Sequence, residues 1–162
     1  MPLLGFFQAL EHSALPVAIR ESTWGYAALI GSHVLGLGLF LGTVIIVDLR
    51  LLNRGIRTSP VPDLITRLLP WTRAGFGVMA ASGTILFVTE AAKCYQSAAF
   101  RIKLGLIALA LLNAWVFHLR SYHGNPPASD RVTPRSWKLT GALSILLWLG
   151  ALAAGRAVGY AL

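Results

Sequence analysis

The side chain in this sequence best suited to chemistry is His33. It is the one strongly polar residue in an uncharged run from Trp24 to Val47. At ~1.5 Å per residue, a helix over this run reaches ~36 Å, which exceeds the ~30 Å of a bilayer's hydrocarbon core. A segment inside lipid must be helical, because no water is present to satisfy open backbone groups. An ionisable side chain at such a depth is a candidate functional residue.

The surroundings expected for His33 favour haem b as its ligand. A haem iron takes a neutral imidazole nitrogen, and a flat macrocycle needs glycine-lined space, which Gly36 and neighbouring glycines of the same run would provide. The haem propionates need Arg or Lys, and Arg156, Lys103 and Arg101 are expected near the same membrane surface. Four-helix bundles commonly hold cofactors in this way. We therefore expect a haem site in this half of the molecule.

Each of these residues also has a simpler interpretation. His33 would serve equally as a hydrogen-bond donor between helices, with Asn113 or a backbone carbonyl as its partner. Arg156 would extend to the interface without binding a ligand, as long basic side chains near helix ends do. Glu90 and Lys93 are three residues apart and would pair with each other.

A second axial ligand is harder to find in the sequence. His118, the other histidine expected within a span, would lie ~12 Å deeper than His33. Three arrangements remain open: the spans are staggered, His12 is the partner of His33, or His118 and His123 belong to a separate site. His118 would otherwise anchor its helix at the interface or pair with Asp48.

Composition indicates a membrane protein. Of 162 residues, 56% are hydrophobic and 12% are charged, with a mean hydropathy of +0.66, whereas soluble domains carry ~25% charged residues. The single cysteine, Cys94, excludes an internal disulfide. The net charge of +8 is better explained by loop arginines that fix membrane orientation than by nucleic-acid binding.

Four hydrophobic blocks organise the chain. We expect an all-α fold, in which residues 1–162 form one membrane domain built as an integral four-helix bundle. Residues 1–21 form an amphipathic helix on the bilayer surface. The predicted spans cover residues of about 23–49, 71–92, 100–121 and 139–160, with a proline-broken loop over 50–72.

The distribution of basic residues predicts the orientation. Of the 14 Lys and Arg residues, nine fall in the loops after the first and third spans, and five (Arg20, Lys93, Arg101, Lys103 and Arg156) fall on the other side. Positive charge accumulates on the cytoplasmic side. Both termini are therefore expected on the periplasmic side of a bacterial inner membrane, with His33 ~15 Å below that surface.

Several stretches are suggestive when taken together: Arg20 to Trp24, His33 followed by Leu35 and Gly36, Asp48 to Leu52, Leu69 to Trp71, Phe100 to Lys103, Asn113 with His118, and Gly155 with Arg156 and Tyr160. On these stretches the chain resembles a family of small, uncharacterised four-helix proteins of the bacterial inner membrane, over nearly its full length. It is also distantly similar to four-helix membrane cytochrome b and copper-resistance D-type proteins. This second similarity implies haem, with His33 and His118 as the matching residues.

The leading hypothesis is an electron-transfer subunit that holds haem b and passes electrons between a periplasmic redox protein and a quinone or a respiratory complex. No motif predicts an enzyme acting alone. The alternative is a cofactor-free structural or assembly subunit of a larger membrane complex, with His33 as a packing residue. A solute or metal permease is a third hypothesis, for which copies of the chain would form the path as an oligomer.

Overall fold

The protein is described by a computed structural model over residues 2–54, 60–122 and 133–160. Every secondary-structure element in these ranges is helical. The elements are α1 (Pro2–Glu11), α2 (Ala14–Glu21), α3 (Gly25–Leu51), α4 (Val61–Thr89), α5 (Ala91–Gln96), α6 (Ala98–Val116), the π-helical turn η1 (Phe117–Tyr122) and α7 (Arg135–Tyr160).

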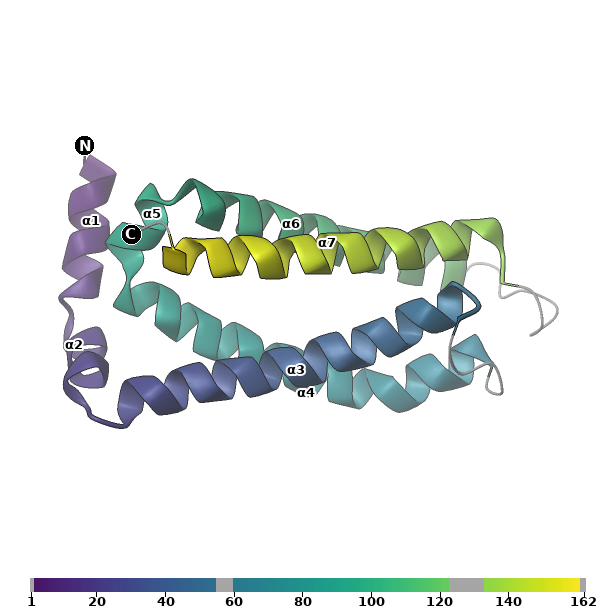
Figure 1. Ribbon diagram of the computed structural model, residues 1–162, viewed down its shortest axis with the longest axis horizontal. Coiled ribbons are helices and arrows are strands. Elements are labelled where there is room, and N and C mark those ends of the chain that lie inside the picture. Colours follow the sequence, from purple (N-terminus) through teal and green to yellow (C-terminus); the bar gives the residue numbers. More distant parts are fainter. Residues whose placement is uncertain (1, 55–59, 123–132, 161–162) are drawn as a thin grey trace.

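Four long helices lie lengthwise beside one another, as Figure 1 shows. Helix α3 packs on α4, and α6 packs on α7, so the molecule has two layers, which are joined by contacts between α3 and α7. We call the end that carries α1, α2 and α5 the capped end. The opposite end, where α3 leads to α4 and η1 leads to α7, is the loop end.

Three of the described helices are long and apolar enough to cross a membrane. They cover Gly25–Leu51, Ala98–Leu119 and Arg135–Gly159, close to the predicted spans 23–49, 100–121 and 139–160. Helix α4 is of similar length, but Asp63, Arg67 and Arg73 occupy its first half, so its apolar part is shorter. Large apolar side chains face outward on these helices, for example Leu35 at 76% exposure, as expected of surfaces that contact lipid.

Helix α4 differs most from its prediction. It begins at Val61, ten residues before the predicted start at 71, and continues through Pro70. The prolines that indicated a loop instead begin the helix: Pro60 caps it and Pro62 lies in its first turn, where a missing N–H costs nothing. The helix ends at Thr89 rather than 92, because Glu90 leaves helical geometry before α5 begins.

The predicted surface helix over residues 1–21 is in fact two helices, and both lie across the capped end (Figure 1). Phe7 of α1 stacks on Tyr95 of α5 with 4.8 Å between ring centres. Glu11 pairs with Arg20 at 3.1 Å and accepts a hydrogen bond from the backbone N–H of Ala92 at 3.2 Å. The N-terminal segment is thus bound to the α4–α5 junction by specific contacts.

Two buried clusters hold the layers together. The loop-end cluster contains Leu51, Val61, Ile65, Phe117 and Trp137, contributed by α3, α4, η1 and α7. The mid-bundle cluster contains Phe40, Ala110 and Trp148. No such cluster of buried side chains is found nearer the capped end within the described residues, where the layers diverge (Figure 1).

A glycine crossing brings α3 and α4 into close contact. A Cβ atom on Gly75 would lie 2.6 Å from the backbone nitrogen of Phe40, and one on Gly36 would lie 2.9 Å from that of Met79. Small residues that allow such an approach are typical of helix pairs in membranes. Gly36 therefore has a packing role between α3 and α4 rather than the predicted place beside a cofactor.

A candidate cofactor site around His33

His33 projects from α3 toward α4, where Ser82 is its partner. Its Nδ1 atom lies 3.0 Å from Ser82 Oγ. The ring also packs over Gly83, where a Cβ atom would lie 3.0 Å from His33 Cε1. An alanine at position 83 would therefore crowd the imidazole, so this glycine makes the space that the ring occupies.

The hydrogen bonds of this turn determine which imidazole nitrogen carries the proton. Ser82 Oγ donates its proton to the carbonyl of Val78 at 2.6 Å, so it accepts from His33. The same hydroxyl also lies 3.3 Å from the Met79 carbonyl, a second acceptor for its proton. Ser82 belongs to α4, and Nδ1 is the nitrogen that faces it. In a neutral imidazole the proton is then on Nδ1, and the lone pair is on Nε2.

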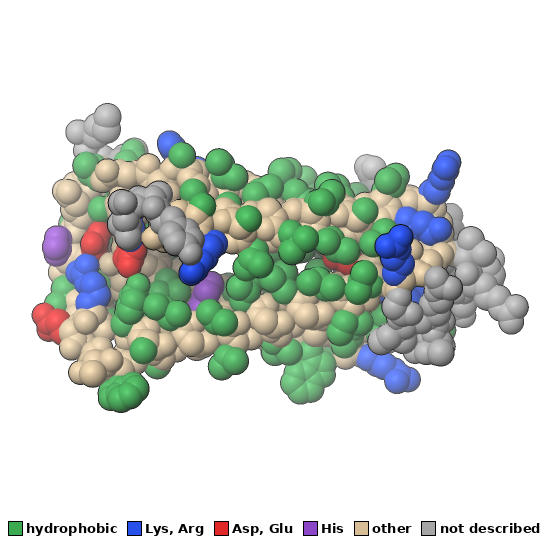
Figure 2. Space-filling model, in the orientation of Figure 1, with side chains coloured by type: hydrophobic (Ala, Val, Ile, Leu, Met, Phe, Trp, Pro, Cys, Tyr) green, Lys and Arg blue, Asp and Glu red, His purple; other side chains and the backbone are tan. Residues whose placement is uncertain are grey.

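The imidazole borders two adjoining cavities between the layers, of about 400 Å³ and about 680 Å³. Both fall in the size range of small-molecule and cofactor sites, roughly 300–1,000 Å³. Figure 2 shows a histidine beside a basic side chain in the hollow between the layers, toward the capped end. The two cavities share these lining residues: His33, Leu37, Gly83, Phe87, Phe100, Lys103 and Leu152.

The polarity of the cavities changes along the bundle. The part toward mid-bundle is lined by apolar side chains, among them Phe76, Ile107 and Trp148. The part toward the capped end adds Arg156 and Glu90 to the lining. A ligand that fits this gradient has an apolar body and a charged end, with the charged end at the bundle's capped end.

Basic side chains predominate where the larger cavity approaches the capped end. Two ion pairs form among the described residues, Arg20 with Glu11 at 3.1 Å and Lys93 with Glu90 at 3.2 Å, and the second confirms the predicted pairing. Glu90 also accepts a hydrogen bond from Tyr26 at 2.9 Å, so its carboxylate is already engaged. Lys103 takes part in neither ion pair and is available to an anionic ligand group.

Other candidate residues lie away from this site. His118 is in the π-helical turn near the loop end, where Nδ1 donates to the Ala114 carbonyl at 3.0 Å. His12 is exposed between α1 and α2, and Arg101 is exposed on α6, outside the lining of both cavities. Asn113 donates to the Thr140 carbonyl at 3.1 Å and joins α6 to α7, not to His33. His123 lies outside the described residues.

Asp48, which was one alternative partner for His118, has a different partner in the structure. Asp48 is 5% exposed, and Ser144 of α7 hydrogen-bonds its carboxyl group. Its Oδ2 atom has no hydrogen-bond partner among the described residues. This carboxyl group belongs to the closed part of the bundle near the loop end, far along α3 from His33.

Cys94 borders the larger cavity from α5 and is 7% exposed. Burial raises the pKa of its thiol, and the nearby Glu90 carboxylate raises it further. A thiol with a raised pKa is a poor nucleophile and metal ligand at neutral pH. Within the described residues no group of three or more His, Cys, Asp or Glu side chains is placed to hold a metal ion.

The residues that sequence reasoning missed are those of α4 and α6 that face His33. Ser82 and Gly83 were visible only as small residues of a span, and Phe87 and Phe100 only as apolar ones. Phe87 and Phe100 stack with ring centres 5.4 Å apart and join α4 to α6 beside the cavity. Their positions in the sequence carry no chemical signal, because small and apolar residues recur throughout both helices.

Comparison with known proteins agrees with the first of the two resemblances noted in the sequence. A family model described as a family of unknown function, DUF6644, matches residues 6–161. Searches of curated proteins and of solved structures returned no match. The similarity to membrane cytochromes b therefore stays a prediction. Because the family model covers nearly the whole chain, the protein belongs to the DUF6644 family.

Proposed function

We propose that the protein is a membrane electron-transfer subunit that binds haem b through His33. One observation carries this proposal: the Nδ1 atom of His33 is held by Ser82, so Nε2 retains its lone pair on a ring that borders two cavities. Hydrogen bonding through one imidazole nitrogen commonly orients the other toward a metal. Haem supplies a one-electron redox couple when it is bound.

The residues around His33 fit the macrocycle. The cavities are apolar toward mid-bundle, as the porphyrin body requires, and Phe87 and Phe100 provide flat apolar surfaces. Lys103 and Arg156 lie where the propionates would need cations. Arg101, which is exposed on α6, is left out of this set. The other predicted ligands, His12 and His118, are not part of it either.

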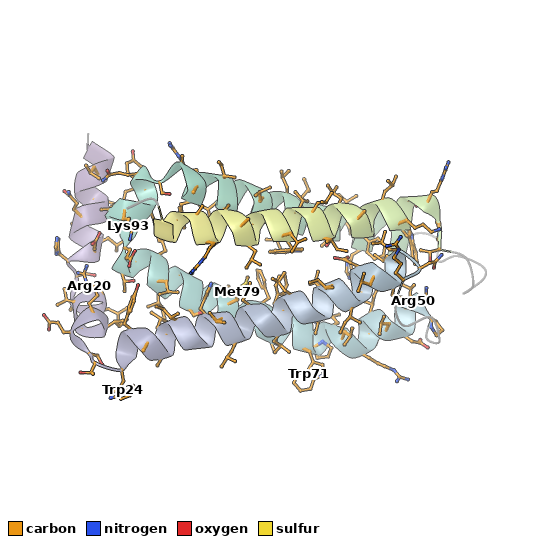
Figure 3. The ribbon with its side chains drawn as sticks, viewed as in Figure 1. Arg20, Trp24, Arg50, Trp71, Met79 and Lys93 are labelled. Carbon is orange, nitrogen blue, oxygen red and sulfur yellow. The ribbon has the colours of Figure 1, made fainter. Side chains whose placement is uncertain are left out.

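The location of the protein follows from the same proposal. Three described helices are suited to crossing a membrane, and α4 completes a four-helix membrane bundle if its apolar half spans the core. We propose a bacterial inner membrane, with the capped end and both termini on the periplasmic side. Trp24 and Trp71 point away from the bundle (Figure 3) and are 80% and 60% exposed, as interfacial aromatic residues are. A periplasmic redox protein would meet the capped end, and a quinone or a respiratory complex would exchange electrons within the membrane.

An absorption spectrum of the detergent-purified protein tests this proposal. We expect a Soret band that shifts on reduction with dithionite and that is lost in His33→Ala. His118→Ala and His12→Ala are matched controls, and both should keep the band, because these residues lie away from the cavities. A colourless protein that elutes as a folded species would contradict haem binding.

A cofactor-free structural subunit is the second candidate, and one observation favours it. A Cβ atom added to Gly31, Gly38 or Gly42 of α3 would meet no atom of another element within 4 Å, so a small-residue surface faces outward. Such surfaces suit close helix packing against another membrane protein. In that case the His33–Ser82 hydrogen bond is a packing contact. Copurification of a partner with colourless protein, and an unchanged complex in His33→Gln, would support this candidate.

A further inference from the structure

We infer that a haem held by His33 keeps its sixth axial position open to small uncharged ligands such as carbon monoxide, nitric oxide or dioxygen. This inference rests on the proposed function. It concerns the wall that faces His33 across the cavities. That wall belongs to α6 and α7, the layer opposite α3 and α4.

The wall is built mainly from side chains that cannot bind iron. Its members include Phe100, Leu104, Ile107, Trp148 and Leu152, with Lys103 as the basic one. A lysine ammonium has three donors and no lone pair, so it is no ligand while protonated. Arg156, which borders the larger cavity, has a guanidinium group with five donors and no acceptor. Protein ligands of haem iron are instead His, Met, Cys or Tyr.

Side chains of the ligand types that border the cavities come from α3, α4 and α5, not from α6 or α7. Met79 borders the smaller cavity, but it comes from α4, in the same layer as His33 (Figure 3). Tyr26 donates its hydroxyl proton to Glu90, and Cys94 lies on α5 at the capped end. His118 lies in η1, toward the loop end. Apart from Lys103 and Arg156, the side chains that α6 and α7 are described as contributing to the cavities are thus apolar or small.

The lining of the smaller cavity suits such ligands. Helices α3 and α7 touch at mid-bundle, where Phe40 meets Trp148 with ring centres 4.7 Å apart, and the cavity bordered by Trp148 is lined mostly by apolar side chains. The small ligands named above are uncharged and apolar, so this lining presents no barrier to them.

Carbon monoxide added to the dithionite-reduced, detergent-purified protein tests the inference. We expect a shift of the Soret band in the wild-type protein. Leu152→His would place an imidazole on the α7 wall of both cavities, opposite His33, so it should give a six-coordinate low-spin spectrum that carbon monoxide changes at least tenfold more slowly. Gel filtration of each variant shows whether it is folded.

The outcomes separate the two proposals. A Soret band that is six-coordinate, low-spin and insensitive to carbon monoxide in the wild type would overturn the open position and leave haem binding intact. If Lys103→Leu then became sensitive, Lys103 would be the sixth ligand, which also overturns it. Absence of any Soret band in folded protein would overturn both the proposed function and this inference.

Discussion

The loop-end half of the bundle is closely packed, whereas the capped-end half contains cavities. At the loop end, Leu51 and Trp137 are 1% and 2% exposed, and a polar contact joins the residues that follow α3 to those that precede α7: Thr133 Oγ1 donates to Asn53 Oδ1 at 2.6 Å. At the capped end the layers diverge, and the space between them is bordered by His33 and Lys103. The basic residues labelled in Figure 3 show the same contrast, because Arg50 is 4% exposed at the loop end and Arg20 lies on the capped end's surface.

This difference indicates that the two halves of the bundle have separate structural roles. The loop-end half closes the bundle with aromatic and aliphatic side chains and so sets the relative position of the layers. The capped-end half leaves cavities between the layers, and α1, α2 and α5 pack across its end. Cavities between packed layers cost stability through lost contacts, so a cavity of this size is retained more readily when the opposite half is well packed.

The largest expected effect comes from removing an aromatic side chain of the loop-end cluster. Trp137→Ala should lower the free energy of unfolding by about 3–5 kcal/mol, because the ring is buried against Phe117 with 5.2 Å between ring centres. Phe87→Ala, a matched change at the cavity, should cost less, since that ring already borders empty space. Thermal unfolding in detergent measures both variants. Equal losses would show that the halves do not differ in packing.

A smaller effect is expected at the glycine crossing between the halves. Gly75→Ala should destabilise the protein by about 1–3 kcal/mol, because the new Cβ atom would lie 2.6 Å from the Phe40 nitrogen. Gly77→Ala, two residues along the same helix, meets no atom within 4 Å and should be neutral or stabilising by up to about 1 kcal/mol. The same unfolding experiment distinguishes them. Similar values for the two variants would argue against a close contact of α3 with α4.

The smallest expected effect is on the alkylation rate of the Cys94 thiol at the capped end. Burial and the Glu90 carboxylate raise the pKa of this thiol above its ordinary value of 9.0. The thiolate is the reactive form, so alkylation by N-ethylmaleimide should be slow at neutral pH and should increase only as the pH rises above that value. The unfolded protein in detergent is the reference and should react faster at every pH. Equal rates for the folded and unfolded protein would show that α5 does not bury the thiol.

Much of the fold could be predicted from the sequence, because each hydrophobic block is long enough to indicate a helix. The start of α4 could not, since Pro60 and Pro62 read equally as breakers of a helix and as residues of its first turn. The break between α1 and α2 was also missed. The amphipathic pattern over residues 1–21 continues across His12 and Ser13, where the helix breaks.

The candidate site was only half predictable. Position along the spans placed His33 and Lys103 in the same half of the bundle, and both border the cavities. The rotation of each helix about its axis, which decides the neighbours of a side chain, is not given by position alone. Asn113 was therefore expected beside His33, whereas Ser82 takes that place and Asn113 turns to Thr140.

The hydrogen bond from Ala92 to Glu11 joins residues 81 positions apart. Ala92 follows Glu90, which borders the larger cavity, by two residues. A bulky fusion at the N-terminus that pulled α1 away from the bundle would therefore strain a segment that borders the larger cavity. The first helices and this cavity are linked by a direct contact, and a protein prepared for spectroscopy is better tagged elsewhere.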